Sequence, residues 1–360
     1  MKAITVVPGD PASAELTDVA EPSPSEGAVL VATTAVGICG TDREIVEHGY
    51  GEVPPGERRL IVGHESVGHV LEAPSDSGFV SGDLVVGIVR APDPVPCECC
   101  RVGQWDMCRN GLFTERGIRG RHGFGRERFR IEPYQLIKVD PALGGLAVLL
   151  EPTSVVAKAW EQIHRIGRRA CFEPKVAVVT GAGPIGLLAA LLSVQQGLDT
   201  HVVDRVTDGP KPQLVRDLGA TYHSEAVGDL GVAADIVVEC TAAGQVAIDV
   251  MRTAAPNVVM ALVGISMGTQ TVESDRHDGA AAEKSASAAD AIDRALVLTN
   301  SVVFGSVNAA YRHYEQGAAA LSAADPTWLG RLLTRRAGPA EWPTALSKQS
   351  DDIKVVVGWE

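Results

Sequence analysis

Residues 94–108, PVPCECCRVGQWDMC, contain four of the seven cysteines of this 360-residue chain. The four thiols belong to Cys97, Cys99, Cys100 and Cys108. Clustered thiols form disulfides in oxidising compartments and bind metal ions in reducing ones. The N-terminal sequence MKAITVVPGD reaches a proline and a glycine before an apolar segment could form, so we expect no signal peptide and a cytoplasmic location. The cluster is therefore expected to hold a metal ion.

Three separated fragments supply a second set of metal-ligand types. Cys39 lies in GICGTD, His64 and Glu65 lie in GHESVGH, and Glu151 lies in LLEPTS. Taken singly, each has a structural explanation, because buried thiols, hydrogen-bonded core histidines and acids at helix N-termini are common. Together they offer a thiolate, an imidazole and carboxylates, which suit a catalytic Zn²⁺ that keeps one coordination position open.

A glycine-rich motif, GAGPIG, follows a valine-rich run and precedes an apolar one. It fits the pattern GxGxxG, whose glycines let the backbone approach a pyrophosphate at a helix N-terminus. The candidate cofactor residues of the motif are Gly181, Gly183, Pro184, Ile185 and Gly186. A dinucleotide-binding strand, turn and helix are therefore expected here, and a fold of the same type without a nucleotide is the alternative.

Asp204 ends the next strand-like run, THVVD, at the offset where a carboxylate binds the adenosine ribose. A carboxylate there accepts hydrogen bonds from the 2′-hydroxyl and repels a 2′-phosphate, so NAD is the expected cofactor. The adjacent Arg205 could help to accommodate a 2′-phosphate. NADP therefore stays open.

Composition bears on the class of partner. Lys and Arg number 32 against 45 Asp and Glu, which gives a formal net charge of −13. Nucleic-acid binding relies on clustered basic residues, so we expect no nucleic-acid partner and disfavour a zinc-ribbon nucleic-acid module. No run approaches the roughly 18 apolar residues of a membrane span, so no membrane partner is expected either.

The elements that must position these residues change character near residue 155. Before it, short β-like runs alternate with Gly and Pro, which indicates a β-rich domain. These runs are 3–7, 27–36, 66–73, 82–89 and 129–139. After it, apolar runs alternate with helical patterns, which is typical of βαβ units on a parallel sheet. We expect strands within 175–180, 200–204, 234–241, 257–264 and 302–309, a polar loop over 270–290, and a β-like tail at 351–359.

The fragments GICGTD, GHESVGH, the cysteine cluster, EPTS and GAGPIG occur here in the order that they have in one enzyme family. The chain resembles the zinc-dependent medium-chain alcohol and polyol dehydrogenases over nearly its whole length. TERGIRGRHGFG, LEPTSVVAKAWE and LTNSVVFGSVNA resemble the glucose (aldose) 1-dehydrogenase branch.

The resemblance implies an α/β protein with a GroES-like β-rich catalytic domain and a doubly wound Rossmann domain. The implied boundaries are 1–155 for the catalytic domain, 156–306 for the Rossmann domain and 307–360 for a C-terminal return to the catalytic domain. A homodimer or homotetramer is implied as well.

The same resemblance assigns roles to individual residues. Cys39 and His64 match the zinc ligands, and Glu65 and Glu151 match carboxylates that bind zinc directly or through water. Thr41 matches the hydroxyl that passes the substrate proton outward. The residues that match hydroxyl-binding positions for a sugar are Glu115, Asn300 and Asn308, although Glu115 and Asn300 could equally be solvated surface residues.

In the family a structural zinc is bound by cysteines spaced C-x2-C-x2-C-x7-C. Cys97, Cys100 and Cys108 match the last three positions, but Pro94 stands at the first. Cys99 is the expected substitute and Asp93 a second candidate, while a metal-free lobe with reduced thiols is the alternative. The cluster is expected to brace the fold, since a closed tetrahedral site has no place for a substrate.

The implied reaction is zinc-dependent, NAD(P)-linked oxidation of an aldose at C1 to the lactone. The alternatives are a polyol, aminocyclitol or other secondary-alcohol dehydrogenase of the same family, or a protein that binds NAD without catalysis. One departure is that Glu44 stands where many alcohol dehydrogenases place a histidine of the proton relay.

Overall fold

The computed structural model describes residues 1–264 and 296–359, and the polar loop expected at 270–290 lies outside them. The chain forms two compact units, which are described separately. The first comprises Met1–Ala157 with Asn308–Glu360, and the second comprises Lys158–Val307. These units divide at 157/158 and 307/308, whereas the boundaries at 155/156 and 306/307 stay predictions from sequence.

Three sheets build the first unit. The largest has the strand order β11-β6-β5-β3-β19-β18, and β10 also pairs with β3. Its strands are β3 (Val29–Ile38), β5 (Glu65–Glu72), β6 (Leu84–Gly87), β10 (Arg128–Ile131), β11 (Leu136–Lys138), β18 (Leu333–Ala337) and β19 (Lys354–Gly358). The second sheet contains β1 (Lys2–Val7), β2 (Asp10–Asp18) and β4 (Leu60–Ile61), and the third contains β7 (Arg90–Ala91), β8 (Thr114–Arg116) and β9 (Gly120–Arg121).

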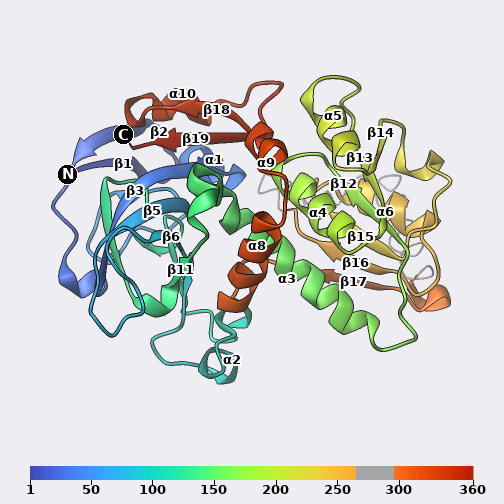
Figure 1. Cartoon of the computed structure of the whole chain (residues 1–360), viewed down its shortest axis with the longest axis horizontal. Coiled ribbons are helices and arrows are strands. Elements are labelled where there is room, and N and C mark those ends of the chain that lie inside the picture. The colour runs from blue at the N-terminus through green and yellow to red at the C-terminus, as the bar shows by residue number, and fades with distance from the viewer. Residues whose placement is uncertain (265–295, 360) are drawn as a thin grey trace, which may run out of the picture. The chain divides into compact units, whose positions relative to one another are not determined.

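The strand β3 lies at the centre of the largest sheet because it pairs with β5, β10 and β19. Alternate residues of its first half are buried and its last four are all buried, as expected for a strand that is covered on both faces at one end. Figure 1 shows the C-terminal β19 beside β3, and the register pairs Val355 with Ile38. The last strand of the chain therefore lies next to the end of β3.

One sequence expectation for this unit was wrong in detail. The run 129–139, read as a single β-like stretch, is divided into β10, the short 3-10 helix η3 (Pro133–Gln135) and β11. Proline fixes φ near −65° and has no N–H to donate to a ladder, so Pro133 ends the first strand and opens a turn.

The helices of the first unit are short, apart from α3 and α8. They are α1 (Gly40–His48), α2 (Glu98–Arg101), α3 (Leu150–Gly167, which continues into the second unit), α8 (Tyr311–Ser322), α9 (Pro326–Leu332) and α10 (Trp342–Leu346). The 3-10 helices are η1 (Pro24–Glu26), η2 (Trp105–Met107), η3, η4 (Pro141–Leu149) and η6 (Pro339–Glu341). The 3-10 helices η1, η3, η4 and η6 begin with proline, whose fixed φ suits the first position of a helix.

The second unit is a parallel sheet with the order β14-β13-β12-β15-β16-β17. Its strands are β12 (Val176–Thr180), β13 (Asp199–Val203), β14 (Thr221–His223), β15 (Ile236–Glu239), β16 (Val259–Leu262) and β17 (Val302–Gly305). The helices between them are α4 (Pro184–Gln195), α5 (Pro210–Asp217) and α6 (Gly244–Thr253), with the 3-10 helix η5 (Val227–Asp229).

This order is that of a doubly wound dinucleotide-binding sheet, 3-2-1-4-5-6. The direction of progression reverses at β12, and right-handed crossovers in two directions place helices on both faces. The fold class predicted for this part of the chain is confirmed. Ligands bind such sheets at the carboxyl ends of the strands where the order reverses, which is the end of β12.

One segment of the described chain, Pro141–Gly167, is long and apolar enough to cross a membrane by length and composition alone. From the sequence we expected no apolar run of this length. The most apolar part of this segment is 72% buried inside the fold, as in the core helix of a globular protein.

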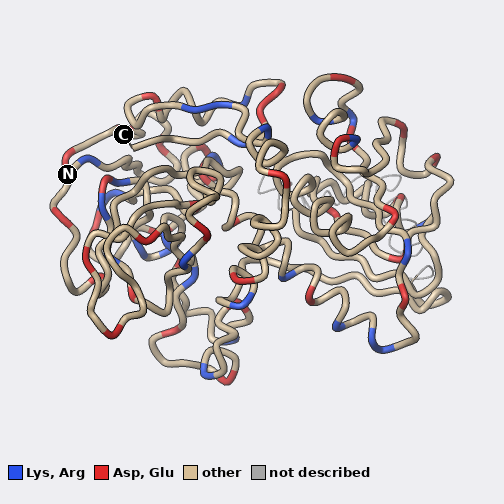
Figure 2. Tube along the Cα trace, viewed as in Figure 1, with Lys and Arg blue, Asp and Glu red and all other residues tan. Residues whose placement is uncertain are grey.

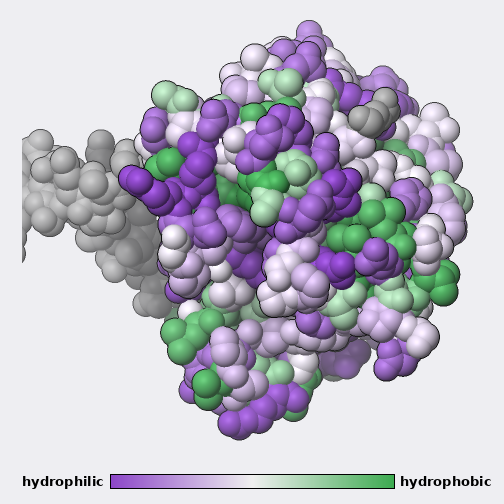
Figure 3. All heavy atoms as spheres, turned by 90° about the vertical axis from the view of Figure 1, so that its left-hand side faces the viewer, coloured by the Kyte–Doolittle hydropathy of each residue, from purple (hydrophilic) through white to green (hydrophobic). Residues whose placement is uncertain are grey.

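Charges of both signs are interspersed along the trace in Figure 2. The face drawn in Figure 3 is likewise a mixture, mostly hydrophilic with smaller hydrophobic groups between. Exposed apolar side chains of the cysteine-rich lobe, which we define as residues 93–112, include Val95, Val102, Met107 and Leu112.

Candidate active site

The end of β3 and the start of β5 bring three predicted metal ligands together. Cys39 follows β3, and the adjacent β5 begins with Glu65, directly after His64. One ligand atom from each of these residues lies within 4.8 Å of the other two. A Cβ on Gly37, which pairs with Glu65 across the ladder, would stand 2.0 Å from Glu65 Oε2. Glycine at position 37 therefore leaves room for this carboxylate.

Asp42 orients two members of this group. Its Oδ2 accepts the Cys39 backbone N–H at 2.8 Å, which fixes Cys39 at the start of α1. Its Oδ1 lies 3.5 Å from His64 Nδ1. Burial opposes the charged imidazole, but the Asp42 carboxylate outweighs it and raises the pKa of His64 well above its ordinary value. A metal ion would replace that proton, because a ligating histidine is neutral.

Lys354 holds the carboxylate of Glu65. Its ammonium donates to both oxygens at 2.6 Å and to the Ile38 carbonyl at 3.3 Å. Both side chains are at most 2% exposed. Burial alone would lower the pKa of Lys354, but the charges of Glu65 and Cys39 raise it above its ordinary value. Lys354 starts β19, so the pairing of β19 with β3 is what delivers it.

Glu151 lies in the first turn of α3 and is buried. It does not belong to the group of three ligands that lie within 4.8 Å. Burial, assisted by the negative charge of Glu65, raises the pKa of Glu151 to about 7. This carboxyl group can therefore gain or lose a proton near neutral pH.

Thr41 lies beside the metal-ligand group, in the first turn of α1. Its Oγ1 is 3.9 Å from Cys39 Sγ, and the residue is partly exposed. A hydroxyl in this position can exchange protons between a buried centre and water. The role of Thr41 in a relay stays a prediction.

Two of the three predicted sugar-binding residues are joined directly. Asn308 Nδ2 donates to Glu115 Oε1 at 2.8 Å, and both residues are buried. Arg90 also donates to that oxygen, from Nε at 3.0 Å and Nη2 at 2.9 Å. Asn300 is an exposed residue of the second unit with a left-handed φ of 51°, and its carbonyl accepts from the Arg169 guanidinium.

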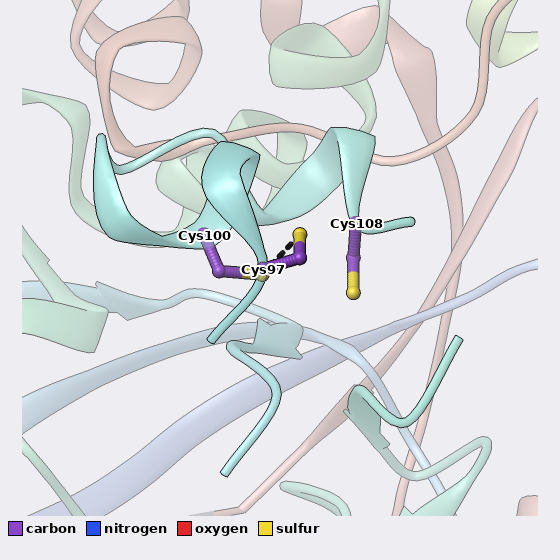
Figure 4. A group of neighbouring side chains, drawn as sticks. All are labelled: Cys97, Cys100 and Cys108. Atoms are coloured by element: carbon purple, nitrogen blue, oxygen red, sulfur yellow. Dashed lines mark hydrogen bonds between the residues drawn. The ribbon is translucent and has the colours of Figure 1, made fainter. Parts of the chain in front are cut away.

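Three of the four thiols of the cysteine-rich lobe lie close together. One sulfur from each of Cys97, Cys100 and Cys108 lies within 4.8 Å of the others (Figure 4). Cys97 and Cys100 come from the turn of α2, where residues three apart share a face, and their sulfurs lie 3.7 Å apart. Cys99 is not in the group, because residues two apart on a helix do not face the same side.

The polar surroundings of these sulfurs fit a metal site. The Arg109 N–H donates to Cys97 Sγ at 3.4 Å, and with the Cys100 N–H it lowers the pKa of Cys97 to about 6. Burial raises the pKa of Cys100 to about 11. Bound metal would deprotonate such a thiol outright.

The structure offers two candidates for a fourth ligand. Cys99 lies outside the group of three sulfurs, as described above. Asp93 is 2% exposed, and its backbone N–H lowers the pKa of the Cys100 thiol. Its Oδ1 accepts from Val95 N–H at 2.8 Å, while its Oδ2 is buried and has no hydrogen-bond partner among the described residues. Asp93, like Cys99, lies outside the group of three ligands, but a metal ion would satisfy its orphaned buried carboxylate oxygen.

The glycine-rich turn has the shape that a pyrophosphate requires. Gly181 adopts a left-handed φ of 87°, and a Cβ on Gly186 would stand 1.7 Å from the Gly181 carbonyl oxygen. Among the described residues, no atom lies within 4 Å of a Cβ built on Gly183, so these residues leave the space above the N-terminus of α4 open. Pro184 and Ile185 are the first residues of α4. Unpaired N–H groups and the helix dipole favour an anion there.

Asp204 is tied to this turn. Its Oδ2 accepts the Ala182 N–H at 2.6 Å, and its Oδ1 accepts the Val206 N–H at 3.1 Å. The ammonium of Lys211, in the first turn of α5, lies 3.6 Å from Oδ2. Arg205 is exposed. The carboxylate predicted to bind ribose thus has a cation beside it that sequence reasoning did not assign.

Sequence reasoning also missed Asp42, Lys354 and Arg90. Asp42 could have been identified from the local sequence, because it lies three residues after the N-cap residue Cys39, as in a capping box. Lys354 is a single charge at the start of the apolar run KVVVG. Such a charge, on a strand that becomes central in a sheet, needs a buried partner.

Comparison with known proteins places the chain in a family. Residues 144–359 match the family described as "Glucose dehydrogenase C-terminus", and residues 25–141 match "Alcohol dehydrogenase GroES-like domain". The chain is 38% identical to glucose 1-dehydrogenase 2 of Vulcanisaeta moutnovskia over 99% of each chain. It is 39% identical to glucose 1-dehydrogenase 1 of Caldivirga maquilingensis, over 99% of this chain and 98% of the relative.

A solved structure shares the whole fold. The glucose dehydrogenase of Haloferax mediterranei, in complex with NADP, Zn and gluconolactone, superposes with a TM-score of 0.87. It is 31% identical to this chain and the match covers 100% of this chain and 99% of that one.

Proposed function

The chain belongs to the zinc-dependent medium-chain dehydrogenases, in the glucose dehydrogenase branch, and from this premise we propose that it oxidises an aldose at C1 to the lactone with NAD(P). The observation that carries the proposal is the group of Cys39, His64 and Glu65, in which His64 and Glu65 are buried and Cys39 is partly exposed. A thiolate, an imidazole and a carboxylate that converge in this way fit Zn²⁺. When bound, Zn²⁺ would lower the pKa of the sugar hydroxyl, and the nicotinamide would accept the hydride.

The side chains of this centre divide the remaining work. Cys39 and His64 would hold the metal, and Asp42 orients both. Glu65 and Glu151 would supply carboxylates to the metal, directly or through water. Glu151, with a pKa of about 7, can hold a proton or release it during turnover.

Proton removal is assigned to Thr41. Its hydroxyl lies beside Cys39 Sγ and at the edge of the buried centre, so it can take the proton of the substrate hydroxyl and pass it to water. A Thr41→Ala enzyme is expected to lose about 10²-fold or more in kcat, the range of general acid–base catalysis, while Thr41→Ser keeps most of it. Unaltered turnover of Thr41→Ala would remove this role.

The sugar is proposed to be bound by Glu115 and Asn308, which share one hydrogen bond. Asn300 is a third candidate. The cofactor is proposed to lie on the turn that contains Gly181, Gly183, Pro184, Ile185 and Gly186, with Asp204 and Arg205 toward the adenosine ribose. A structural zinc is proposed at Cys97, Cys100 and Cys108, with Cys99 or Asp93 as the fourth ligand.

The decisive experiment is an assay of purified protein with NAD and NADP against aldoses, polyols and simple secondary alcohols. It is run before and after removal of metal with a chelator. Aldose oxidation that is lost on chelation and restored by Zn²⁺ is expected. Full activity of the metal-free protein would overturn the role of zinc, and turnover of polyols or other alcohols without turnover of aldoses would favour the alternative dehydrogenase.

Two finer properties belong to the same proposal. We expect a homodimer or homotetramer in the cytoplasm, with a sugar as the small-molecule partner and neither nucleic acid nor membrane. Light scattering after gel filtration measures the mass of the assembly, and a monomer at micromolar concentration would contradict it. Cell fractionation tests the location.

A further inference from the structure

A buried guanidinium lies directly beneath the proposed sugar-binding carboxylate. Arg90 in β7 and Glu115 in β8 are cross-strand partners in an antiparallel pair. Both side chains are less than a tenth exposed. One face of the guanidinium is covered by the Phe113 ring, whose centroid lies 3.8 Å from Arg90 Cζ. The pair is therefore held in a dry environment, where a hydrogen bond to a charged group is strong.

The three hydrogen bonds that described residues make to the Glu115 carboxylate all end on the same oxygen. Oε1 accepts from Arg90 Nε, from Arg90 Nη2 and from Asn308 Nδ2, at 3.0, 2.9 and 2.8 Å. Three donors on one oxygen fix the plane and direction of the carboxylate. Among the described residues, no side-chain hydrogen bond ends on its other oxygen, Oε2, and this oxygen is not one of the fully buried atoms. The second oxygen is therefore presented in a fixed direction and can accept from a sugar hydroxyl.

The last nitrogen of the same guanidinium reaches the cysteine-rich lobe. Arg90 Nη1 donates to the Asp106 carbonyl at 3.1 Å. Asp106 lies in η2, between Cys100 and Cys108 in sequence. One side chain thus joins the lobe that gathers the thiols to the carboxylate that would bind the sugar.

We propose that Arg90 is the positioning residue for the sugar-binding carboxylate of Glu115 and that it anchors this carboxylate to the cysteine-rich lobe. The inference rests on the proposed function, since it needs Glu115 to contact the sugar. The lobe would then have a second role besides stabilising the fold, which is to hold Arg90 in place. A movement of the lobe would also move the Asp106 carbonyl that accepts from Arg90.

Only arginine has the donors that this position uses. Its planar fork points Nε and Nη2 at Glu115 while Nη1 reaches Asp106, whereas a lysine has a single nitrogen. Arg90→Lys should therefore keep the positive charge and lose the fixed direction of the carboxylate. Arg90→Met removes the charge and the hydrogen bonds and keeps an apolar stem under Phe113.

The test compares Arg90→Lys and Arg90→Met with the control Arg119→Met. Arg119 lies near the same Phe113 ring, at 5.0 Å, but pairs with Glu52 at the surface. Hydrogen bonds to charged groups correspond to about 10-fold or more in affinity. We therefore expect KM for glucose to rise by about that factor in both Arg90 variants while kcat changes less than about 3-fold, as for lost binding without lost chemistry.

Equilibrium binding of gluconolactone to the cofactor-loaded enzyme, measured by calorimetry, should weaken by the same factor. The Arg119 control should leave KM and binding unchanged. An Arg90→Met enzyme that folds and keeps the wild-type KM and lactone affinity would overturn the inference. If Arg90→Met does not fold, Arg90→Lys decides by the same criteria.

Failure of the inference can be told apart from failure of the proposed function. Glu115→Gln alone must raise KM for glucose, and an unchanged KM there would reject the sugar role of Glu115 and this inference with it. If Glu115→Gln raises KM and the Arg90 variants do not, only the positioning role fails. Since Arg90 acts through Glu115, the double variant Arg90→Met/Glu115→Gln should raise KM little beyond the larger of the two single variants.

The link to the lobe has its own readout. Backbone amides of residues 104–108 should exchange hydrogen faster in Arg90→Met than in wild type or Arg119→Met, because Asp106 loses its buried donor. Equal exchange rates in all three proteins would reject the lobe as the anchor.

Discussion

The ion pair between Lys354 and Glu65 makes the sharpest prediction about stability. Lys354→Met removes an ammonium that donates to both carboxylate oxygens at 2.6 Å and leaves Glu65 buried without a counter-charge. Removing one partner of a buried pair costs about 3–5 kcal/mol, because the other charge loses both water and its partner. With about 2–4 °C of Tm per kcal/mol for a domain of this size, Tm should fall by about 6–20 °C.

The assay is thermal unfolding of metal-free protein followed by circular dichroism. The double variant Lys354→Met/Glu65→Met should recover most of the lost stability, since an apolar pair of similar volume is often as stable as a buried ion pair. Lys138→Met is the matched control. Lys138 pairs with Asp83 at 2.7 Å but is 53% exposed, and such surface pairs contribute about 0–1 kcal/mol.

The pH at which the assay is run follows from the sign of the shift. The folded state raises the pKa of Lys354, so the stability that its charge contributes is complete below the unfolded value and is lost only as pH rises through the higher folded value. Neutral pH therefore shows the full difference. A Lys354→Met protein within about 2 °C of wild type, or a double variant no more stable than the single one, would refute this reasoning.

Three further predictions concern metal and cofactor. Asp42→Asn should weaken zinc binding by about 10–100-fold, because a partner that orients a ligating histidine is lost, and competition with a chromophoric chelator measures it; unchanged affinity contradicts that role. Asp93→Ala should lower zinc content by one ion per chain while Cys99→Ala retains it, because Asp93 Oδ2 is buried without a hydrogen-bond partner among the described residues; elemental analysis measures this, and the reverse result would assign Cys99 as the ligand. Lys211→Met should weaken NADPH binding about 10-fold and NADH binding less, because the ammonium beside Asp204 offsets its repulsion of a 2′-phosphate; equal losses in a fluorescence titration would reject this.

Sequence determined the parts of the fold that contiguous residues encode. The valine run before GAGPIG and the apolar run after it predict a strand, a tight turn and a helix, and the structure places β12, the turn and α4 there. Only glycine fits at position 186, where a Cβ would meet a carbonyl oxygen at 1.7 Å, so the motif itself carries the geometry. The β-like tail at 351–359 likewise contains β19.

The sequence also predicted the types of metal ligand, but it predicted less well which residues lie together in one site. Cys39, His64 and Glu65 were predicted from their fragments, and adjacent strands bring them together. Cys99 was expected only as a substitute for Pro94, outside the family spacing, and the helical turn of α2 separates it from the face that Cys97 and Cys100 share. A count of cysteines does not say which way each sulfur points.

Tertiary structure alone decided which charges meet. Lys354 and Glu65 are 289 positions apart in the sequence. They meet only because β19, the last strand of the chain, pairs with β3. Arg90 reaches Glu115 through a two-strand register and Asp106 through a turn of the lobe. Local sequence patterns specify strands and turns because residues that are neighbours in the sequence interact in any conformation. The partner of a buried charge depends on how segments distant in the sequence pack together. Residue types therefore predict which chemical groups the site contains, whereas only the tertiary structure shows how those groups are oriented.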